Sequence, residues 1–236
     1  MNENKIELPI AHNSSNYSVN PSKILCLGFN YPIQSTEGKR KVPKDPPKTP
    51  LLFPKTPNVL IGNDSKILYP KILHKIGLDQ VDYEGELAVI MGKRGKNISK
   101  EHYKEFVLGY TCFNDVTARA FQLHLREKSW PWFMSKSLDT FGPIGPQLVL
   151  QEDIDDPNDL ILTTLLNNRE VQKTNTSEMF FKVDIIIEYI SKYFTLYPGD
   201  IIATGTPSGV GSLSPGDFIE VKIENIGTLR NKVESE

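Results

Sequence analysis

The chain has 236 residues and is 39% hydrophobic, so it can bury a sizeable core within one large domain. Its 27 basic and 29 acidic residues give a formal net charge of -2, which argues against nucleic acid or a membrane surface as a partner. The two cysteines, Cys26 and Cys112, stand in apolar runs and predict buried thiols rather than disulfides or cysteine metal ligands. The sequence has neither an apolar signal region nor a run of about 18 apolar residues, so we expect a cytoplasmic protein.

The first part of the sequence predicts an arm, a strand and a long loop. Residues 1–20 are polar and rich in Asn and Ser, which indicates a loose or peripheral arm before a domain spanning residues 21–236. Residues 23–28 form an apolar run that is typical of a short buried strand. Residues 30–57 are rich in Pro and Lys and predict a lid-like loop. The basic side chains between residues 38 and 55 either attract an anionic substrate or simply solvate a charged surface.

The rest of the chain predicts short strands and a few helices. Apolar runs predict strands within residues 58–69, at residues 83–91 and at residues 106–113. Capping and helical spacing predict helices at residues 100–105 after Ser99, at residues 117–128, and from Ser177 onward. Two Pro-Gly turns, within residues 196–200 and 213–217, suit a glycine with a positive φ and precede apolar runs. We therefore expect a strand-rich α+β fold without regular βαβ alternation.

Two acidic residues in one predicted strand are the first candidates for a functional site. Glu84 and Glu86 are two residues apart, so their side chains point to the same face of a strand. The apolar run that follows places these like charges at the edge of a core, where they are costly unless a cation compensates. Asp115 follows the predicted strand at residues 106–113 and can supply a third oxygen. Three carboxylates suit Mg²⁺, Mn²⁺ or Ca²⁺ better than zinc. The alternative is that Glu84 and Glu86 line the solvent face of a half-exposed strand.

Five short motifs follow one another along the chain. They are GFNY at residues 28–31, DYEGELAV at 82–89, GYTCFNDVTAR at 109–119, SKSLDTFGP at 135–143 and PGDIIATGTPSGVG at 198–211. In this order they resemble the motifs of the fumarylacetoacetate hydrolase family. The resemblance implies a mixed β-sandwich roll with a few short helices, usually assembled as a homodimer. It also implies an enzyme that cleaves, decarboxylates or isomerises β-diketo and 2-oxo acids with Mg²⁺ or Mn²⁺.

The same resemblance implies roles for individual residues. It assigns metal ligation to Glu84, Glu86 and Asp115, an active-site lysine to Lys136, and substrate contacts to Gln122 and Thr206. The motif at residues 198–211 resembles the closing loop of the family and contains both Gly205 and Thr206. Three carboxylates around a 2+ ion leave a surplus negative charge, which Lys136 could offset while stabilising a developing oxyanion. A surface ion pair is the alternative for Lys136, and an ordinary exposed side chain is the alternative for Gln122. Arg119 could bind a substrate carboxylate, but we favour a structural role in which it braces Asp115 or a neighbouring strand.

The predicted lid departs from the family pattern at one position. Many hydrolytic and decarboxylating members carry a His and a Glu three residues apart, and the His activates water, aided by the Glu. Here Glu37 fills the Glu position, but Gln34 replaces the His and has no titratable nitrogen. Loss of a general base typically costs about 10²–10⁴ in rate, whereas keto–enol exchange needs only a proton shuttle such as Glu37.

We therefore expect an enzyme that converts a small anionic 2-oxo acid through a metal-bound enolate, as a tautomerase, isomerase or decarboxylase. Hydrolysis of a C–C bond in an acylpyruvate or fumarylacetoacetate is one alternative. A catalytically silent protein that binds a 2-oxo acid is another.

Overall fold

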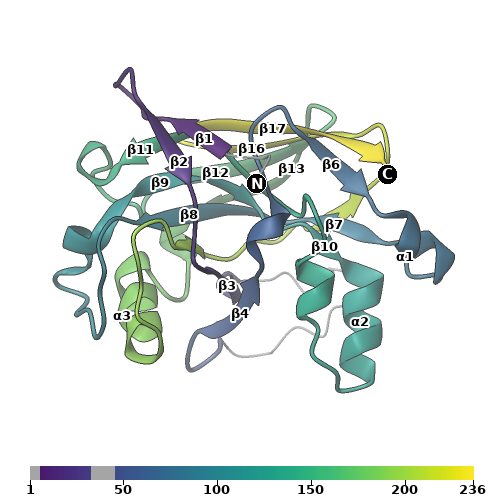
Figure 1. Cartoon of the computed structure of the whole chain (residues 1–236), viewed down its shortest axis with the longest axis horizontal. Helices are drawn as coiled ribbons and strands as arrows, with labels where there is room; N and C mark the ends of the chain where they lie inside the picture. Colours follow the sequence, from purple (N-terminus) through teal and green to yellow (C-terminus); the bar gives the residue numbers. More distant parts are fainter. Residues whose placement is uncertain (1–5, 33–45) are drawn as a thin grey trace.

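The computed structural model describes residues 6–32 and 46–236, and strands dominate this part of the chain (Figure 1). The largest sheet has the order β4 (Leu51–Lys55), β3 (Ile24–Gly28), β14 (Ile201–Ala203), β8 (Gly85–Met91), β9 (Val107–Asn114), β11 (Gly142–Leu150) and β5 (Leu60–Ile61). A second large sheet has the order β13 (Arg169–Asn175), β12 (Ile161–Leu166), β16 (Phe218–Ile223), β17 (Gly227–Ser235) and β6 (Lys66–Tyr69). Both sheets mix parallel and antiparallel pairs, so the predicted strand-rich α+β roll is confirmed.

Smaller elements cover the edges of these sheets. The short sheets are β10 (Thr117–Ala118) with β7 (Val81–Tyr83) and β15 (Gly211–Leu213), and β1 (Ile6–Pro9) with β2 (Asn16–Val19). Among the described residues, the α-helices are α1 (Lys71–Lys75), α2 (Arg119–Glu127) and α3 (Val183–Tyr193). The 3₁₀ turns are η1 (Pro57–Val59), η2 (Tyr103–Phe106), η3 (Phe133–Lys136), η4 (Gln151–Asp153) and η5 (Thr176–Glu178). No helix in the described ranges has the length and apolar character that a membrane crossing requires.

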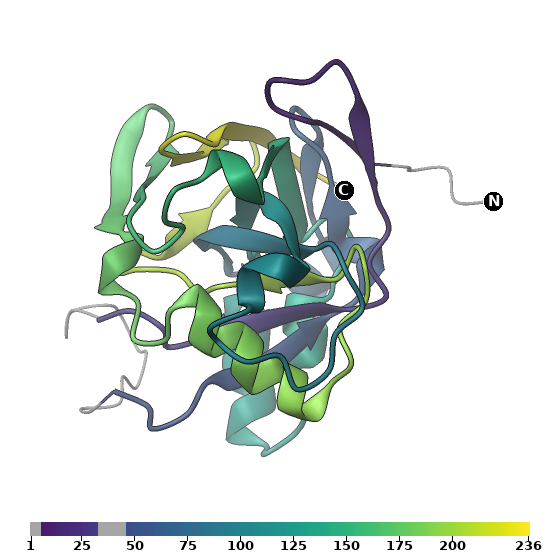
Figure 2. The same cartoon turned by 90° about the vertical axis from the view of Figure 1, so that its left-hand side faces the viewer.

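The largest sheet is buried on both faces, because successive side chains of β8 alternate between two hydrophobic clusters. Leu87 and Val89 join a cluster that includes the apolar face of α3, which lies toward the viewer in Figure 2. Ala88 and Ile90 join the cluster on the opposite face. A strand that is buried on both sides needs a nearly continuous apolar sequence, which explains the run Leu87-Ala-Val-Ile-Met91.

The N-terminal residues form a hairpin. Strands β1 and β2 pair in antiparallel fashion, and the turn between them bonds to β11 through the Ala11 N–H and the Leu148 carbonyl at 2.8 Å. The two Pro-Gly turns are present as predicted, with φ of +87° at Gly199 and +100° at Gly216. The buried thiols of Cys26 and Cys112 are confirmed as well.

Three predicted elements were wrong in extent or type. The predicted strand at residues 83–91 is two strands, β7 and β8, because β7 pairs with β10 and β15 whereas β8 joins the largest sheet. The predicted helix at residues 100–105 is a short 3₁₀ turn that ends where β9 begins. Part of the expected lid is strand β4, whose last residue, Lys55, is buried rather than solvated.

The predicted helices began too early. Helix α2 starts at Arg119, because Thr117 and Ala118 pair with β7. Helix α3 starts at Val183 rather than Ser177, because the backbone N–H groups of Phe180 and Phe181 donate to the buried Asn30. These bonds hold the chain away from helical geometry until the Val183 N–H finds a side-chain acceptor on a distant loop.

Candidate active site

The three carboxylates singled out in the sequence lie together in the structure. Glu84, Glu86 and Asp115 each offer an oxygen, and these atoms all lie within 4.8 Å of one another. All three residues are at most 3% exposed, so they do not line a solvent face. Carboxylates this close and this dry repel one another strongly unless cations stand among them. The arrangement therefore has the donor chemistry of a hard divalent cation site.

Strand pairing brings the carboxylates together. Strands β8 and β9 are antiparallel, with Gly85 opposite Asn114 and Glu86 opposite Phe113. Their ends meet where the Asp115 N–H donates to the Glu84 carbonyl at 2.8 Å. The Glu84 N–H in turn donates to the Asn114 side chain at 3.0 Å. Glu84 thus lies where the chain leaves one sheet for another, and Asp115 lies beside it.

Glu86 has one satisfied oxygen and one free oxygen. Its Oε2 accepts a 2.8 Å hydrogen bond from the backbone N–H of Gly205, whereas its buried Oε1 has no hydrogen-bond partner among the described residues. Burial, reinforced by the charges of Asp115 and Glu84, holds the pKa of Glu86 well above its ordinary value. A dry carboxylate oxygen without a donor is unfavourable by itself and is suited to coordinate a metal ion.

Two buried lysines face the carboxylates. The Lys136 ammonium lies 2.7 Å from Oε2 of Glu84 and 2.5 Å from Oδ2 of Asp115. Burial disfavours its charge, but Asp115 and Glu84 outweigh burial and raise the pKa of Lys136. The Lys55 ammonium lies 2.7 Å from Oδ1 of Asp115 and 3.1 Å from the Val116 carbonyl. Burial lowers the pKa of Lys55 despite its contact with Asp115.

Arg119 has the structural role that we favoured, and of the two expected partners, Asp115 and a neighbouring strand, it braces the neighbouring strand β7. Its Nε donates to Asp82 at 2.8 Å, and its terminal nitrogens donate to Glu84 and, at 2.6 Å, to Oε1 of Gln122. The side chain is 7% exposed, and both acidic partners are buried with it. Arg119 therefore holds Glu84 from one side while Lys136 holds it from the other.

A loop that follows β14 completes the cluster. The Thr206 hydroxyl donates to the Gly85 carbonyl at 2.9 Å, and Gln172 of β13 donates to that hydroxyl at 2.9 Å. The Gly85 N–H donates back to Oε1 of Gln172 at 3.1 Å. Gln172 thereby joins the loop to the backbone between the two glutamates.

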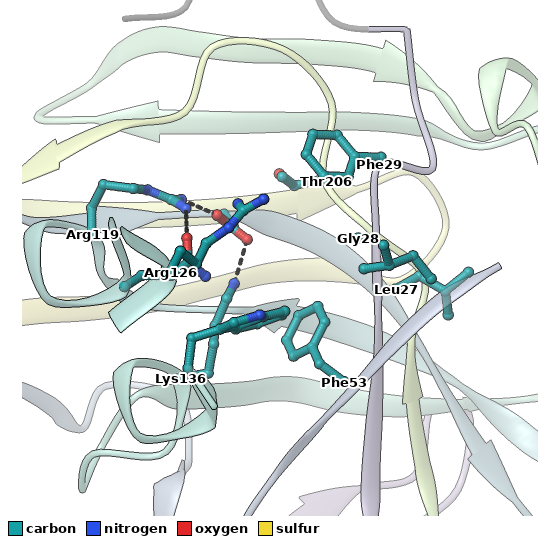
Figure 3. A pocket seen from close by; sticks show the side chains of 12 residues that line it. Leu27, Gly28, Phe29, Phe53, Arg119, Arg126, Lys136 and Thr206 are labelled. Carbon is teal, nitrogen blue, oxygen red and sulfur yellow. Dashed lines mark hydrogen bonds and ion pairs between the residues drawn. The ribbon is translucent and has the colours of Figure 1, made fainter. Parts of the chain in front are cut away.

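A pocket opens beside these residues (Figure 3). Its apolar lining comes from Leu27, Phe29, Leu51, Phe53 and Trp132, and its polar lining comes from Glu84, Arg119, Gln122, Arg126, Lys136 and Thr206. Phe29 has a φ of +54°, an unfavourable backbone conformation for a bulky residue, and such strain is common beside functional sites. The pocket gives a small anionic molecule access to both a charged and an apolar wall.

Comparison with known proteins agrees with this geometry. Residues 23–234 match the family model described as fumarylacetoacetate (FAA) hydrolase C-terminal. The chain belongs to the fumarylacetoacetate hydrolase family. The family resemblance expected from the sequence motifs is therefore confirmed.

Family members with different activities resemble this chain. The mitochondrial oxaloacetate tautomerase of Xenopus laevis is 38% identical over 221 residues, covering 91% of this chain and 66% of that protein. The 5-carboxymethyl-2-hydroxymuconate delta-isomerase of Mycobacterium smegmatis is 36% identical, with a TM-score of 0.78 and coverage of 93% and 81%. The fumarylpyruvate hydrolase of Pseudomonas aeruginosa, solved with Mn²⁺ and pyruvate, is 27% identical, with a TM-score of 0.87 and coverage of 100% and 98%.

The structure places the predicted site residues in two groups. Lys136, Gln122 and Thr206 line the pocket, and Gly205 contacts Glu86 through its backbone. The predicted lid residues Gln34 and Glu37 lie outside the described residues, so their roles stay predictions.

Sequence reasoning gave no site role to Asp82, Lys55 or Gln172. Lys55 was grouped with the basic residues of the lid, and its only signal was the apolar run that precedes it. Gln172 lies between an intermediate and an exposed neighbour on β13, and no pattern in the sequence marks it.

Proposed function

We propose that this protein is a divalent-metal-dependent tautomerase or isomerase of a small 2-oxo acid. The observation that carries the proposal is the buried set of Glu84, Glu86 and Asp115, in which Glu86 Oε1 has no hydrogen-bond partner among the described residues. Together with Asp82, the triad makes four buried carboxylates, whereas the two lysines and Arg119 supply only three positive charges. One more cation at the triad would correct that deficit.

The donor set fits Mg²⁺ or Mn²⁺, with Ca²⁺ as a further candidate. Hard cations prefer oxygen ligands, and all three side chains offer carboxylate oxygens. When bound there, such an ion supplies Lewis acidity that polarises a 2-oxo acid and favours its enolate. The Mn²⁺ and pyruvate in the related hydrolase structure support both the metal and the ligand class.

The surrounding residues orient the acid and balance charge. Lys136 contacts both Glu84 and Asp115, and from the pocket wall it stabilises negative charge on a substrate oxygen. Gln122 and Thr206 present an amide and a hydroxyl to the same pocket and position the substrate. Glu37 is our candidate for moving the proton, and Gln34 for orienting a substrate oxygen.

Keto–enol exchange suits this set of groups. It moves one proton between carbon 3 and the keto oxygen, so it consumes neither water nor a redox partner. The lack of a histidine at position 34 is therefore less costly for exchange than for hydrolysis. The likeness to an oxaloacetate tautomerase and to an isomerase, each at least 36% identical, supports the same reaction class.

Three other activities compete with this proposal. Decarboxylation of a 2-oxo acid uses the same enolate and needs no attacking water. C–C bond hydrolysis is favoured by the TM-score of 0.87 to fumarylpyruvate hydrolase. A protein that binds the acid without turnover would keep the pocket and lose the chemistry.

The test compares the full chain with and without EDTA on two reactions, the ketonisation of enol-oxaloacetate and the cleavage of an acylpyruvate. We expect ketonisation of enol-oxaloacetate to be rapid with Mn²⁺ or Mg²⁺ and to stop with EDTA, while an acylpyruvate is cleaved slowly. Gln34→His should raise hydrolysis relative to exchange, and an unchanged product ratio would show that Gln34 does not decide between the two reactions. Absence of metal-dependent turnover of oxaloacetate and of the acylpyruvate would overturn the proposed enzyme. Sedimentation of the purified chain tests the proposed homodimer.

A further inference from the structure

Arg126 differs from the other cations around the pocket. Arg119 and Lys136 are buried and paired with carboxylates. Arg126 is exposed and lines the pocket, yet its guanidinium has neither an ion pair nor a hydrogen bond within residues 6–32 and 46–236. A guanidinium in a pocket wall without a partner among the described residues has donor capacity for a ligand.

Helical spacing explains why Arg126 faces this pocket. Arg119, Gln122 and Arg126 are three and four residues apart on α2, so they share one face of the helix. Figure 3 shows the Arg126 side chain extending from α2 into the pocket, between Arg119 and Thr206 in this view. A cation in the last turn also complements the helix dipole, but that effect does not require it to line the pocket.

The charges of the site leave room for a dianion. With all groups ionised, the buried cluster has four carboxylates and three cations: Asp82, Glu84, Glu86, Asp115, Lys55, Arg119 and Lys136. One negative charge is left over, and a divalent ion would convert it into one positive charge. Arg126 raises the total to two positive charges. A 2-oxo acid with one carboxylate neutralises half of this charge, whereas one with a second carboxylate neutralises all of it.

We propose that Arg126 binds the distal carboxylate of a 2-oxo dicarboxylic acid and thereby selects diacids over monoacids. The inference rests on the proposed function, because the first carboxylate and the keto oxygen are assigned to the metal side of the pocket. The planar guanidinium can bind a carboxylate through two parallel hydrogen bonds. The apolar wall, which includes Phe53 and Trp132, contacts the carbons between the two ends of the acid.

The test measures binding rather than turnover, with ligands matched in length. Oxaloacetate is compared with 2-oxobutanoate, and 2-oxoglutarate with 2-oxopentanoate, so that only a carboxylate replaces a methyl group. Stopped-flow tryptophan fluorescence of the Mn²⁺-loaded full chain reports binding, because Trp132 lines the pocket. The variants are Arg126→Gln, Arg126→Lys and, as a matched control, Lys128→Gln. Lys128 directly follows α2, and its side chain lies over the ring of Trp130.

We expect the wild type to prefer the diacid of at least one pair by about tenfold or more, as a charge-assisted bidentate contact supplies. Arg126→Gln should abolish that preference while monoacid binding changes less than about twofold, Arg126→Lys should keep part of it, and Lys128→Gln should keep all of it. A wild type without preference in either pair, or an Arg126→Gln variant that keeps the preference, overturns the role of Arg126. If none of the four acids binds in a Mn²⁺-dependent manner, the proposed function itself fails.

Discussion

The backbone N–H of Gly205 donates a 2.8 Å hydrogen bond to one oxygen of Glu86 and fixes the direction of that carboxylate. The other oxygen is buried and has no hydrogen-bond partner among the described residues. The closing loop therefore orients Glu86 without consuming its second oxygen. Glu86 is thus held in place by one oxygen while the other stays available to a metal ion.

Glu86→Gln should abolish tight metal binding while leaving the metal-free fold intact. The amide keeps the size of the side chain and removes a dry negative charge. Loss of groups that merely support a ligand costs about 10–100-fold in metal affinity, so loss of a ligand charge should cost more than roughly 100-fold. Calorimetry with Mn²⁺ measures the affinity, and thermal unfolding with EDTA measures the metal-free stability. Glu105→Gln, which changes an exposed carboxylate, is the control. Unchanged Mn²⁺ affinity in Glu86→Gln would exclude this residue as a ligand.

Lys136→Met should make the protein more dependent on its metal. Removing the ammonium leaves Glu84 and Asp115 with a reduced counter-charge, and breaking a buried pair from one side costs about 3–5 kcal/mol of unfolding free energy. A divalent ion can replace that charge, so the rise in Tm on adding Mn²⁺ should exceed the rise in the wild type, while turnover is lost. Lys192→Met, at an exposed pair on α3, should change neither quantity. A smaller Mn²⁺-induced rise than in the wild type would contradict this account.

Gly85→Ala should destabilise the protein through one contact. A Cβ at this position would lie 2.2 Å from Oγ1 of Thr164, a buried hydroxyl that has no hydrogen-bond partner within the described ranges. Overpacking of this kind costs about 1–3 kcal/mol of unfolding free energy. Thr164→Ala removes the obstructing atom, so the double variant should be more stable than the sum of the two single changes predicts. Additive losses in urea unfolding would show that the crowding arises elsewhere.

Gln172→Leu should loosen the substrate side of the site more than the metal side. Gln172 bonds to Thr206, Pro207 and Gly85, and among the described residues it has no hydrogen bond to the carboxylates of the triad. We expect KM to rise and the unfolding free energy to fall by about 1–3 kcal/mol, as for buried groups that lose their partner. Mn²⁺ affinity should stay within a few-fold of the wild type. Lys173→Leu, at the exposed neighbour, is the control, and equal effects of the two variants would argue against a positioning role for Gln172.

The site was predictable where it depends on residues at the ends of apolar strands. Glu86 and Asp115 follow directly from the boundary between polar and apolar residues on β8 and β9. Glu84 was predicted from its two-residue spacing to Glu86 on a single strand, and that reason was incomplete. Glu84 does not share a strand with Glu86, because the pairing of β7 with β10 and β15 ends one sheet at Tyr83, and such long-range pairing leaves no local signal.

The start of α3 and the burial of Lys55 were not predictable for a related reason. Asn30 redirects the chain at Phe180 and Phe181 although 150 residues separate them, so local helical spacing could not reveal where the helix begins. Lys55 resembles any lysine in a basic segment until β4 pairs with β3 and carries it to Asp115. Both cases show tertiary contacts overriding local sequence preference.

The largest sheet separates two hydrophobic clusters, and each cluster contains one of the two cysteines. Cys26 lies in one cluster near the acidic triad, and Cys112 lies in the other, where its thiol meets the Gly227 carbonyl. Burial raises the pKa of both thiols, that of Cys112 to about 12, so neither reacts readily in the native state. A thiol reagent consequently modifies each cysteine only when its own side of the sheet opens. Each hydrophobic cluster thus contains one cysteine whose labelling rate reports its opening. Labelling rates resolved by peptide can show whether the two clusters open together or one after the other.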